Sequence, residues 1–451
     1  METLLNACAS WSSTLRLDAV PGDVRAIART CLIDTVGVAL AGASTDVGRE
    51  TAAFAASTYG VGGATLFASA KTLQAPGAAF ANAVCAHALD FDDNCYAGVV
   101  HGSAVIVPAA LAVCQAVGAS GERLLTAIIA GAETEYAIGQ AFTLSLYERG
   151  WFNSAFLGPL GASAAACRVL NLDSRATANA LGLAMATAGG SKACFGTDGK
   201  ALLVGRAAEW GVTAALLAAQ GLTGPTDALE GRRGVAELTN GGLLERHAVE
   251  QIGKRWYLRD PGIDIKPAPV CLSSHAAIDA AQQIISEHTI EHFAIQSIIC
   301  DVPELVRGNL KYHDPQTPQE KQFSIQFAVA CSIKFGRIRL DHLALSPDAE
   351  TELQSLMRRV QMVTTDRWLD LSLRERAPEG AFVSIRTFDG SEYTHLACRS
   401  KGVAALPLSV SEVDAKFVAC GLRSKSEGVV SSLLSYLRRI EQMPDLRFLP
   451  T

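Results

Sequence analysis

From Val24 to about residue 255, the chain is a succession of apolar segments with helical spacing and almost no strand-like alternation. Apolar residues recur three and four positions apart, as in Val24, Ile27, Ala28 and Cys31. This is the period of an amphipathic helix and predicts one at residues 24–43. Further helices are expected at residues 74–89, 108–117, 122–140, 160–170, 174–188 and 202–220. This pattern predicts one large helical domain.

The pattern changes after Trp256, where prolines at 261, 267 and 269 mark a boundary. Strands are expected at residues 295–302, 360–364 and 381–388, the last followed by an Asp389-Gly390 hairpin turn. The fold class is therefore mainly α, with a smaller α+β domain. We expect the helical domain at residues 1–260, completed by C-terminal helices within 405–451, and the α+β domain at 261–404.

Residues 87–108 concentrate the chemistry of the chain. Three carboxylates, Asp90, Asp92 and Asp93, lie between His87 and His101, and apolar segments flank the whole stretch. Charge in an apolar setting is costly unless it is paired or used, and such places favour acid–base chemistry. A helix cap or a solvated turn is the alternative interpretation.

Composition argues against several classes of protein. The net charge of −6 gives no reason to expect nucleic acid or an anionic membrane as a partner. Twelve cysteines without a CxxC pair indicate free thiols in a reducing compartment. We therefore expect a cytoplasmic protein without a signal peptide, a mitochondrial location being also open. The longest apolar run, residues 104–119, is short and interrupted, so a buried helix is expected.

Several stretches together resemble the MmgE/PrpD family, which includes 2-methylcitrate dehydratase, cis-aconitate decarboxylase and iminodisuccinate epimerase. They run in family order and comprise residues 32–42, His87-Ala-Leu-Asp90-Phe-Asp-Asp93, residues 157–162, Val204-Gly205-Arg206, residues 222–231, Lys266-Pro-Ala-Pro-Val-Cys271 with His275, and Phe323-Ser324-Ile325. The resemblance implies a helical domain with an α+β lid, a homodimer, and activity on small polycarboxylates without a metal or organic cofactor.

The resemblance also implies a site. It carries catalytic roles to Asp90, His101, Lys200 and His275, and a carboxylate-binding role to Lys266. These residue types suit proton abstraction beside a carboxylate, because a positioned base removes the proton and fixed cations stabilise the negative charge that develops. We predict that the four catalytic residues meet in one cleft between the domains.

Four positions depart from the family pattern. Phe152 stands where many members have a histidine, Leu203 where many have a histidine after the lysine loop, Asn94 where a threonine is common, and Phe327 where a tyrosine is often found. We expect Phe152, Leu203 and Asn94 to contact the substrate. Phe152 and Leu203 would suit a less charged substrate with an alkyl part.

Structural interpretations compete with these roles. His87 is expected to be a satisfied buried histidine, and Lys200 could be a solvated loop residue. A metal site at His87, Asp90 and Asp93 is disfavoured because no cysteine or second close histidine completes the set.

Three functional hypotheses remain open. The first is a lyase that removes water or carbon dioxide from a polycarboxylate such as aconitate, methylcitrate or an alkylcitrate. The second is an isomerase or epimerase that moves an α-proton without elimination. The third is a repurposed family member with an altered pocket.

Overall fold

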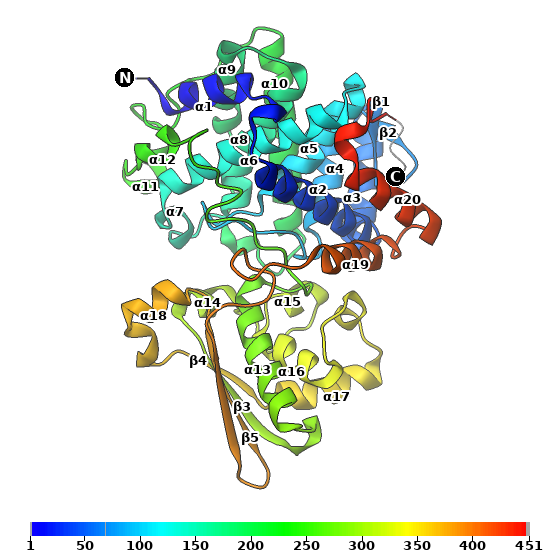
Figure 1. Ribbon diagram of the computed structural model, residues 1–451, viewed down its shortest axis with the longest axis vertical. Helices are drawn as coiled ribbons and strands as arrows, with labels where there is room; N and C mark the ends of the chain where they lie inside the picture. The colour runs from blue at the N-terminus through cyan, green and yellow to red at the C-terminus, as the bar shows by residue number, and fades with distance from the viewer. Residues whose placement is uncertain (1, 68, 448–451) are drawn as a thin grey trace.

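The computed structural model describes residues 2–67 and 69–447 and has a large helical part above a smaller mixed part (Figure 1). The helices of the large part are α1 (Leu4–Thr14), α2 (Gly22–Gly42), α3 (Asp46–Thr58), α4 (Ala75–His87), α5 (Gly102–Val117), α6 (Gly121–Phe142), α7 (Ser145–Glu148), α8 (Asn153–Leu170), α9 (Ser174–Met185), α10 (Gly199–Ala219), α11 (Val235–Asn240) and α12 (Arg246–Glu250). A short hairpin of β1 (Val61–Thr65) and β2 (Thr72–Leu73) lies between α3 and α4.

Small residues allow the core helices to approach closely. A Cβ atom added to Gly42 of α2 would lie 1.9 Å from the backbone oxygen of Cys85 in α4, so only glycine permits this contact. Helix α10 is long and apolar, and 61% of its apolar window is buried, as in the core helix of a folded domain.

The smaller part contains one four-stranded sheet and the helices around it. The sheet has the order β4-β3-β5-β6, with β3 and β4 parallel and the other neighbours antiparallel. The elements of the smaller part are α13 (His275–His288), β3 (Ile295–Asp301), α14 (Glu304–Asn309), α15 (Pro318–Lys321), α16 (Ile325–Phe335), α17 (Pro347–Met357), β4 (Val360–Val363), α18 (Leu371–Arg376), β5 (Ala381–Thr387) and β6 (Glu392–Ala397). The predicted fold class, mainly α with a smaller α+β part, is confirmed.

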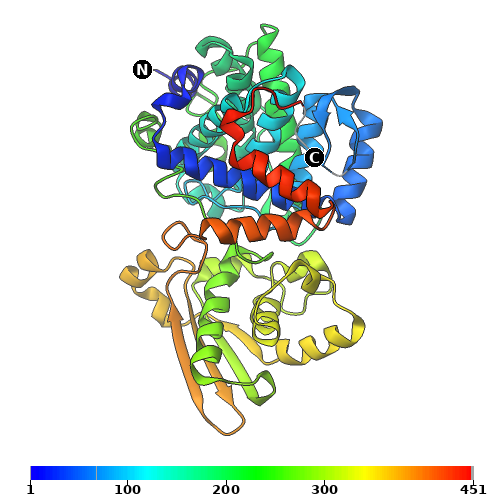
Figure 2. The same ribbon diagram turned by 45° about the vertical axis from the view of Figure 1, so that its right-hand side comes forward.

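The chain then returns to the helical part through α19 (Val410–Gly421) and α20 (Glu427–Arg438). Helix α19 lies along the junction between the two parts (Figure 2). A Cβ atom added to Gly37 of α2 would lie 2.9 Å from the ring of Phe417, so α19 and α2 are in close contact. The domain boundaries stay predictions, because the buried apolar residues form two clusters and each cluster extends across the junction. Phe323, from the smaller part of the chain, belongs to the larger cluster, and Phe91, from the helical part, belongs to the smaller cluster.

Two expected helix starts are wrong. Helix α5 begins at Gly102 and α8 at Asn153, although helices were expected from residues 108 and 160. Pro108 and Pro159 lie inside these helices. Proline normally disfavours a helix interior, but packing of the surrounding apolar segments outweighs that local preference here.

Candidate active site

The site is built around the loop that follows α4. Asp90 has a φ of 48°, in the left-handed region that residues other than glycine seldom adopt. The Nζ atom of Lys266 donates to the backbone oxygen of Asp90 at 2.7 Å and to its carboxylate at 3.1 Å. One lysine therefore fixes both the main chain and the side chain of Asp90.

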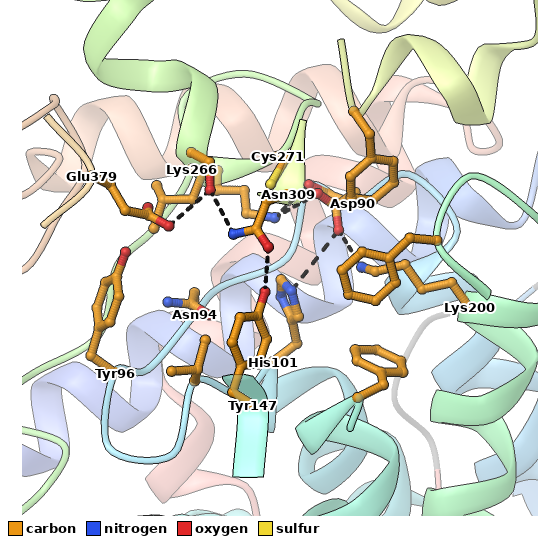
Figure 3. Close-up of a pocket in the computed structure, with 16 residues that line it drawn as sticks. Asp90, Asn94, Tyr96, His101, Tyr147, Lys200, Lys266, Cys271, Asn309 and Glu379 are labelled. Atoms are coloured by element: carbon orange, nitrogen blue, oxygen red, sulfur yellow. Dashed lines mark hydrogen bonds and ion pairs between the residues drawn. The ribbon is translucent and has the colours of Figure 1, made fainter. Parts of the chain in front are cut away.

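A second lysine reaches the same carboxylate from α10. The Nζ atom of Lys200 lies 2.6 Å from Oδ1 of Asp90 (Figure 3). Burial by itself would raise the pKa of Asp90, but Lys200 and Lys266 outweigh it and hold that pKa well below its usual range. Burial likewise opposes the charge of Lys266, yet Asp90 raises the pKa of this lysine. Asp90 and Lys266 therefore form a buried ion pair.

His101 caps the start of α5 and presents one ring nitrogen to the cavity. Its Nδ1 lies 2.8 Å from the backbone oxygen of Asp93, an acceptor, so Nδ1 carries the proton. Its Nε2 lies 3.9 Å from the Asp90 carboxylate. In this tautomer Nε2 has a free lone pair and can act as a base.

His87 lies behind this group. Its Nδ1 contacts the Asp92 carboxylate at 2.7 Å, and its Nε2 accepts from Lys200 at 2.7 Å. Burial lowers the pKa of His87 to about 4 despite the opposing effect of Asp92. The structure thus places His87 as the expected satisfied buried histidine, which also positions the Lys200 ammonium.

The interpretation of Lys200 as a solvated loop residue is wrong, because it lies in the first turn of α10 and is buried. The premise that no second histidine lies near His87 is also wrong. His87, Asp90, Asp92 and His101 place one ligand atom each within 4.8 Å of one another. Lys200 and Lys266 already occupy the oxygens of Asp90, however, so two ammonium groups would repel a metal cation there.

These charges face a cavity of about 40 Å³ that residues from both parts of the chain line. The cavity is lined by Asp90, Asn94, Tyr96, Val99, His101, Tyr147, Phe152, Phe195, Lys200, Lys266, Cys271, Leu272, Ser273, Asn309, Phe323 and Glu379. The ring centroids of Phe152, Phe195 and Phe323 lie 5.1–5.3 Å from the Lys200 Nζ atom. One side of the cavity is therefore aromatic.

Six of the eight residues expected at the site line this cavity: Asp90, Asn94, His101, Phe152, Lys200 and Lys266. His275 and Leu203 do not. His275 opens α13 and is buried, with Nδ1 3.1 Å from the backbone oxygen of Cys271. Leu203 lies near Gly190, where an added Cβ atom would lie 3.7 Å from its Cδ1. Both side chains follow the packing of their own helices and not the cavity.

A hydrogen-bonded row of polar residues was not predicted. The Tyr147 hydroxyl donates to Oδ1 of Asn309 at 2.9 Å, Asn309 donates to Ser273 at 3.1 Å, and the Ser273 hydroxyl donates to Glu379 at 2.8 Å. The row joins α7 of the helical part to three segments of the α+β part. Each residue stands alone in the sequence, so no local motif indicates it.

The C-terminal helix α19 supports the loop from the other side. The Nζ atom of Lys416 donates to the backbone oxygen of Phe91 at 2.7 Å and lies 2.7 Å from the Asp34 carboxylate of α2. All of these groups are buried. Three lysines therefore contact the loop that carries Asp90: Lys266 from the linker between the two parts of the chain, Lys200 from α10 and Lys416 from α19.

Comparison with known proteins adds to this geometry. Residues 6–245 match the MmgE/PrpD N-terminal domain, and residues 268–428 match the MmgE/PrpD C-terminal domain. A cis-aconitate decarboxylase of Homo sapiens is 25% identical over 83% of this chain and 78% of its own length. A cis-aconitate decarboxylase of Mus musculus is 23% identical over 99% and 92%. The cis-aconitate decarboxylase-like protein oryM of Aspergillus oryzae is 25% identical over 75% and 76%.

Proposed function

The chain belongs to the MmgE/PrpD family, and from this premise we propose that it is a lyase acting on a small polycarboxylate related to aconitate. The similarity to cis-aconitate decarboxylases supports this class of reaction. The observation that carries the proposal is the ion-paired Asp90, with Lys200 and Lys266 on its carboxylate and the Nε2 atom of His101 3.9 Å away.

These residues can divide the work of proton transfer. Nε2 of His101 takes a proton from the carbon beside a substrate carboxylate, or returns it. Lys200 and Lys266 stabilise the negative charge that moves onto that carboxylate, an effect that is strongest where water is excluded. In a dehydration, the electron pair of the C–H bond forms the new double bond while hydroxide leaves with a proton as water. In a decarboxylation, the C–C bond breaks, carbon dioxide leaves, and the carbon receives a proton.

The charges along the cavity favour a substrate with few carboxylates. The two lysines face two carboxyl groups, Asp90 and Glu379, and no arginine is among the described lining residues. Burial raises the pKa of Glu379. A tricarboxylate would still bring more negative charge than this lining can neutralise, which supports an aconitate relative with fewer charges.

Incubation with a panel of aconitate, methylcitrate, alkylcitrates and related hydroxy- and unsaturated dicarboxylates that carry an alkyl chain, in deuterated water, tests the reaction. We expect a loss of mass equal to water or carbon dioxide with at least one substrate. Deuterium uptake without mass loss would instead indicate an isomerase or epimerase, which the same base and cations could serve. Neither result with any member of the panel would contradict an enzymatic role in this chemistry.

We also propose a homodimer and a cytoplasmic location. Exposed apolar side chains such as Phe54 and Val61, 55% and 82% exposed, are compatible with a second subunit. Light scattering at micromolar concentration tests the oligomeric state, and a monomer would contradict it.

A further inference from the structure

A second cavity of about 500 Å³ adjoins the active-site cavity. The two cavities share three lining residues, Tyr96, Val99 and Tyr147. In the close-up, Tyr96 lies on the opposite side of the active-site cavity from Lys200 (Figure 3). A molecule that spans both cavities would therefore have its charged end at the lysines and its other end in the larger cavity. We call this larger cavity the outer chamber.

The lining of the outer chamber is mainly apolar. Helix α7, the start of α14, a 3₁₀ turn at Asp366–Leu369 and α18 contribute to it. The apolar members are Val99, Leu144, Pro303, Leu305, Trp368, Leu369, Leu371 and Pro378. A volume in the range of ligand pockets, with a hydrophobic lining and few polar groups, is typical of a binding site for a small molecule.

The rim indicates that an apolar group covers this chamber. Leu144, Leu369 and Leu371 are 48%, 72% and 69% exposed, and all three line this chamber. Clustered exposed leucines are unfavourable in water and mark an interaction site. The charged members are Glu148, Glu304, Glu375 and Arg374, and three carboxylates against one guanidinium would repel a further carboxylate.

We propose that the outer chamber binds an unbranched alkyl chain of the substrate, whose carboxylates lie at Lys200 and Lys266. This inference rests on the proposed function and names its substrate class, an alkylated polycarboxylate. It also moves the alkyl-binding surface away from Leu203, which does not line the active-site cavity. Among the described residues that line the active-site cavity, the cationic side chains of lysine are Lys200 and Lys266, and both already pair with Asp90. This agrees with a substrate that exchanges one charged group for an apolar chain.

Calorimetric binding of 2-alkylsuccinates, from methyl to octyl and below their aggregation concentrations, tests this inference without requiring turnover. Each buried methylene should lower the Kd of the wild-type protein by about fourfold until the chain fills the chamber. Leu369→Arg places a charge at the rim and should reduce the ratio of octyl to methyl affinity by at least about tenfold. Leu238→Arg on α11 is the control, because Leu238 is 73% exposed and lies outside the chamber lining.

Equal Kd values for the methyl and octyl compounds would overturn the inference, as would equal affinity ratios in the Leu369→Arg and Leu238→Arg variants. A change of oligomeric state in Leu369→Arg, with the affinity ratio unchanged, would also overturn it by assigning the rim to a subunit interface. Chain-length dependence without turnover of any alkylcitrate would leave the inference standing and remove the proposed reaction. Turnover of short substrates, with Kd values that do not depend on chain length, would remove the inference and leave the proposed reaction standing.

Discussion

Lys266 holds Asp90 at two points, its backbone oxygen at 2.7 Å and its carboxylate at 3.1 Å. Because Asp90 has a left-handed backbone conformation, this double contact stabilises a geometry that an aspartate rarely adopts alone. The position of the carboxylate between His101 and Lys200 therefore depends on a residue from the linker between the two parts of the chain.

Lys266→Met should lower both stability and turnover. It removes one of the two cations on a buried carboxylate, and breaking a buried ion pair by removing one partner costs about 3–5 kcal/mol. Denaturant unfolding and kcat on the true substrate measure the two effects. Lys311→Met, at an exposed lysine, is the control and should change neither. Full stability in Lys266→Met would contradict the role assigned to the contact.

His101→Ala should reduce kcat by about a hundred- to ten-thousand-fold, the usual cost of losing a general acid–base group. Its melting temperature should fall less than that of His275→Ala, since the His101 side chain is 15% exposed. His275→Ala should show the opposite balance, because His275 is fully buried and lies outside the cavity lining. Measuring both the melting temperature and kcat of each variant distinguishes the two roles. A His275→Ala protein with normal stability and no turnover would restore the catalytic role expected from the sequence.

Lys416→Met should destabilise the protein because it leaves the buried carboxylate of Asp34 without its ion-pair partner. The expected loss is again about 3–5 kcal/mol. The double variant Lys416→Met with Asp34→Leu removes both charges and should recover much of that stability. Denaturant unfolding of the single and double variants completes the cycle. A double variant no more stable than Lys416→Met would show that Lys416 acts through Phe91 alone.

Glu135 on α6 should make the protein sensitive to alkaline pH. Burial, with the nearby charge of Asp93, raises the pKa of Glu135 to about 8 from an ordinary value of 4.5. The folded protein therefore binds more protons than the unfolded chain between these values, and this contribution to stability, complete below pH 4.5, is lost as pH rises through about 8. Glu135→Gln should lessen the fall in melting temperature over that range.

Glu122→Gln, at an exposed position in the first turn of the same helix, is the control for Glu135→Gln and should follow the wild-type pH profile. Identical pH profiles for all three proteins would show that Glu135 is not the group responsible.

Helical periodicity predicted most of the core helices, because apolar residues recur at helical spacing along them. The helix expected at residues 24–43 is α2, Gly22–Gly42. Helix α3, Asp46–Thr58, was not predicted, since its buried residues are Gly48, Thr51, Ala52 and Ala55, which give no strong apolar period. Lys200 was expected in a loop because Gly196 and Gly199 lie just before it, but packing of α10 extends the helix to Gly199.

The site was predictable where its residues share one motif. Asp90 and His101 lie eleven positions apart, and the loop between α4 and α5 brings both to the cavity. Tyr147, Asn309 and Glu379 could not be predicted, since their meeting depends on how the two parts of the chain dock. The failure of Leu203 and His275 to reach the cavity has the same cause, because residue spacing does not determine which way a side chain points in a packed helix.

The contacts of Lys416 affect the order in which a nascent chain can become functional. On a ribosome, α2 and α4 are made early, but Lys416 is added only after every strand of the four-stranded sheet. Until it leaves the exit tunnel, Asp34 and the backbone oxygen of Phe91 lack this partner. The loop that carries Asp90 therefore cannot reach its final support during synthesis of the helical part, although domains commonly fold in order from the N-terminus. A translation product ending before α19 would lack that support permanently.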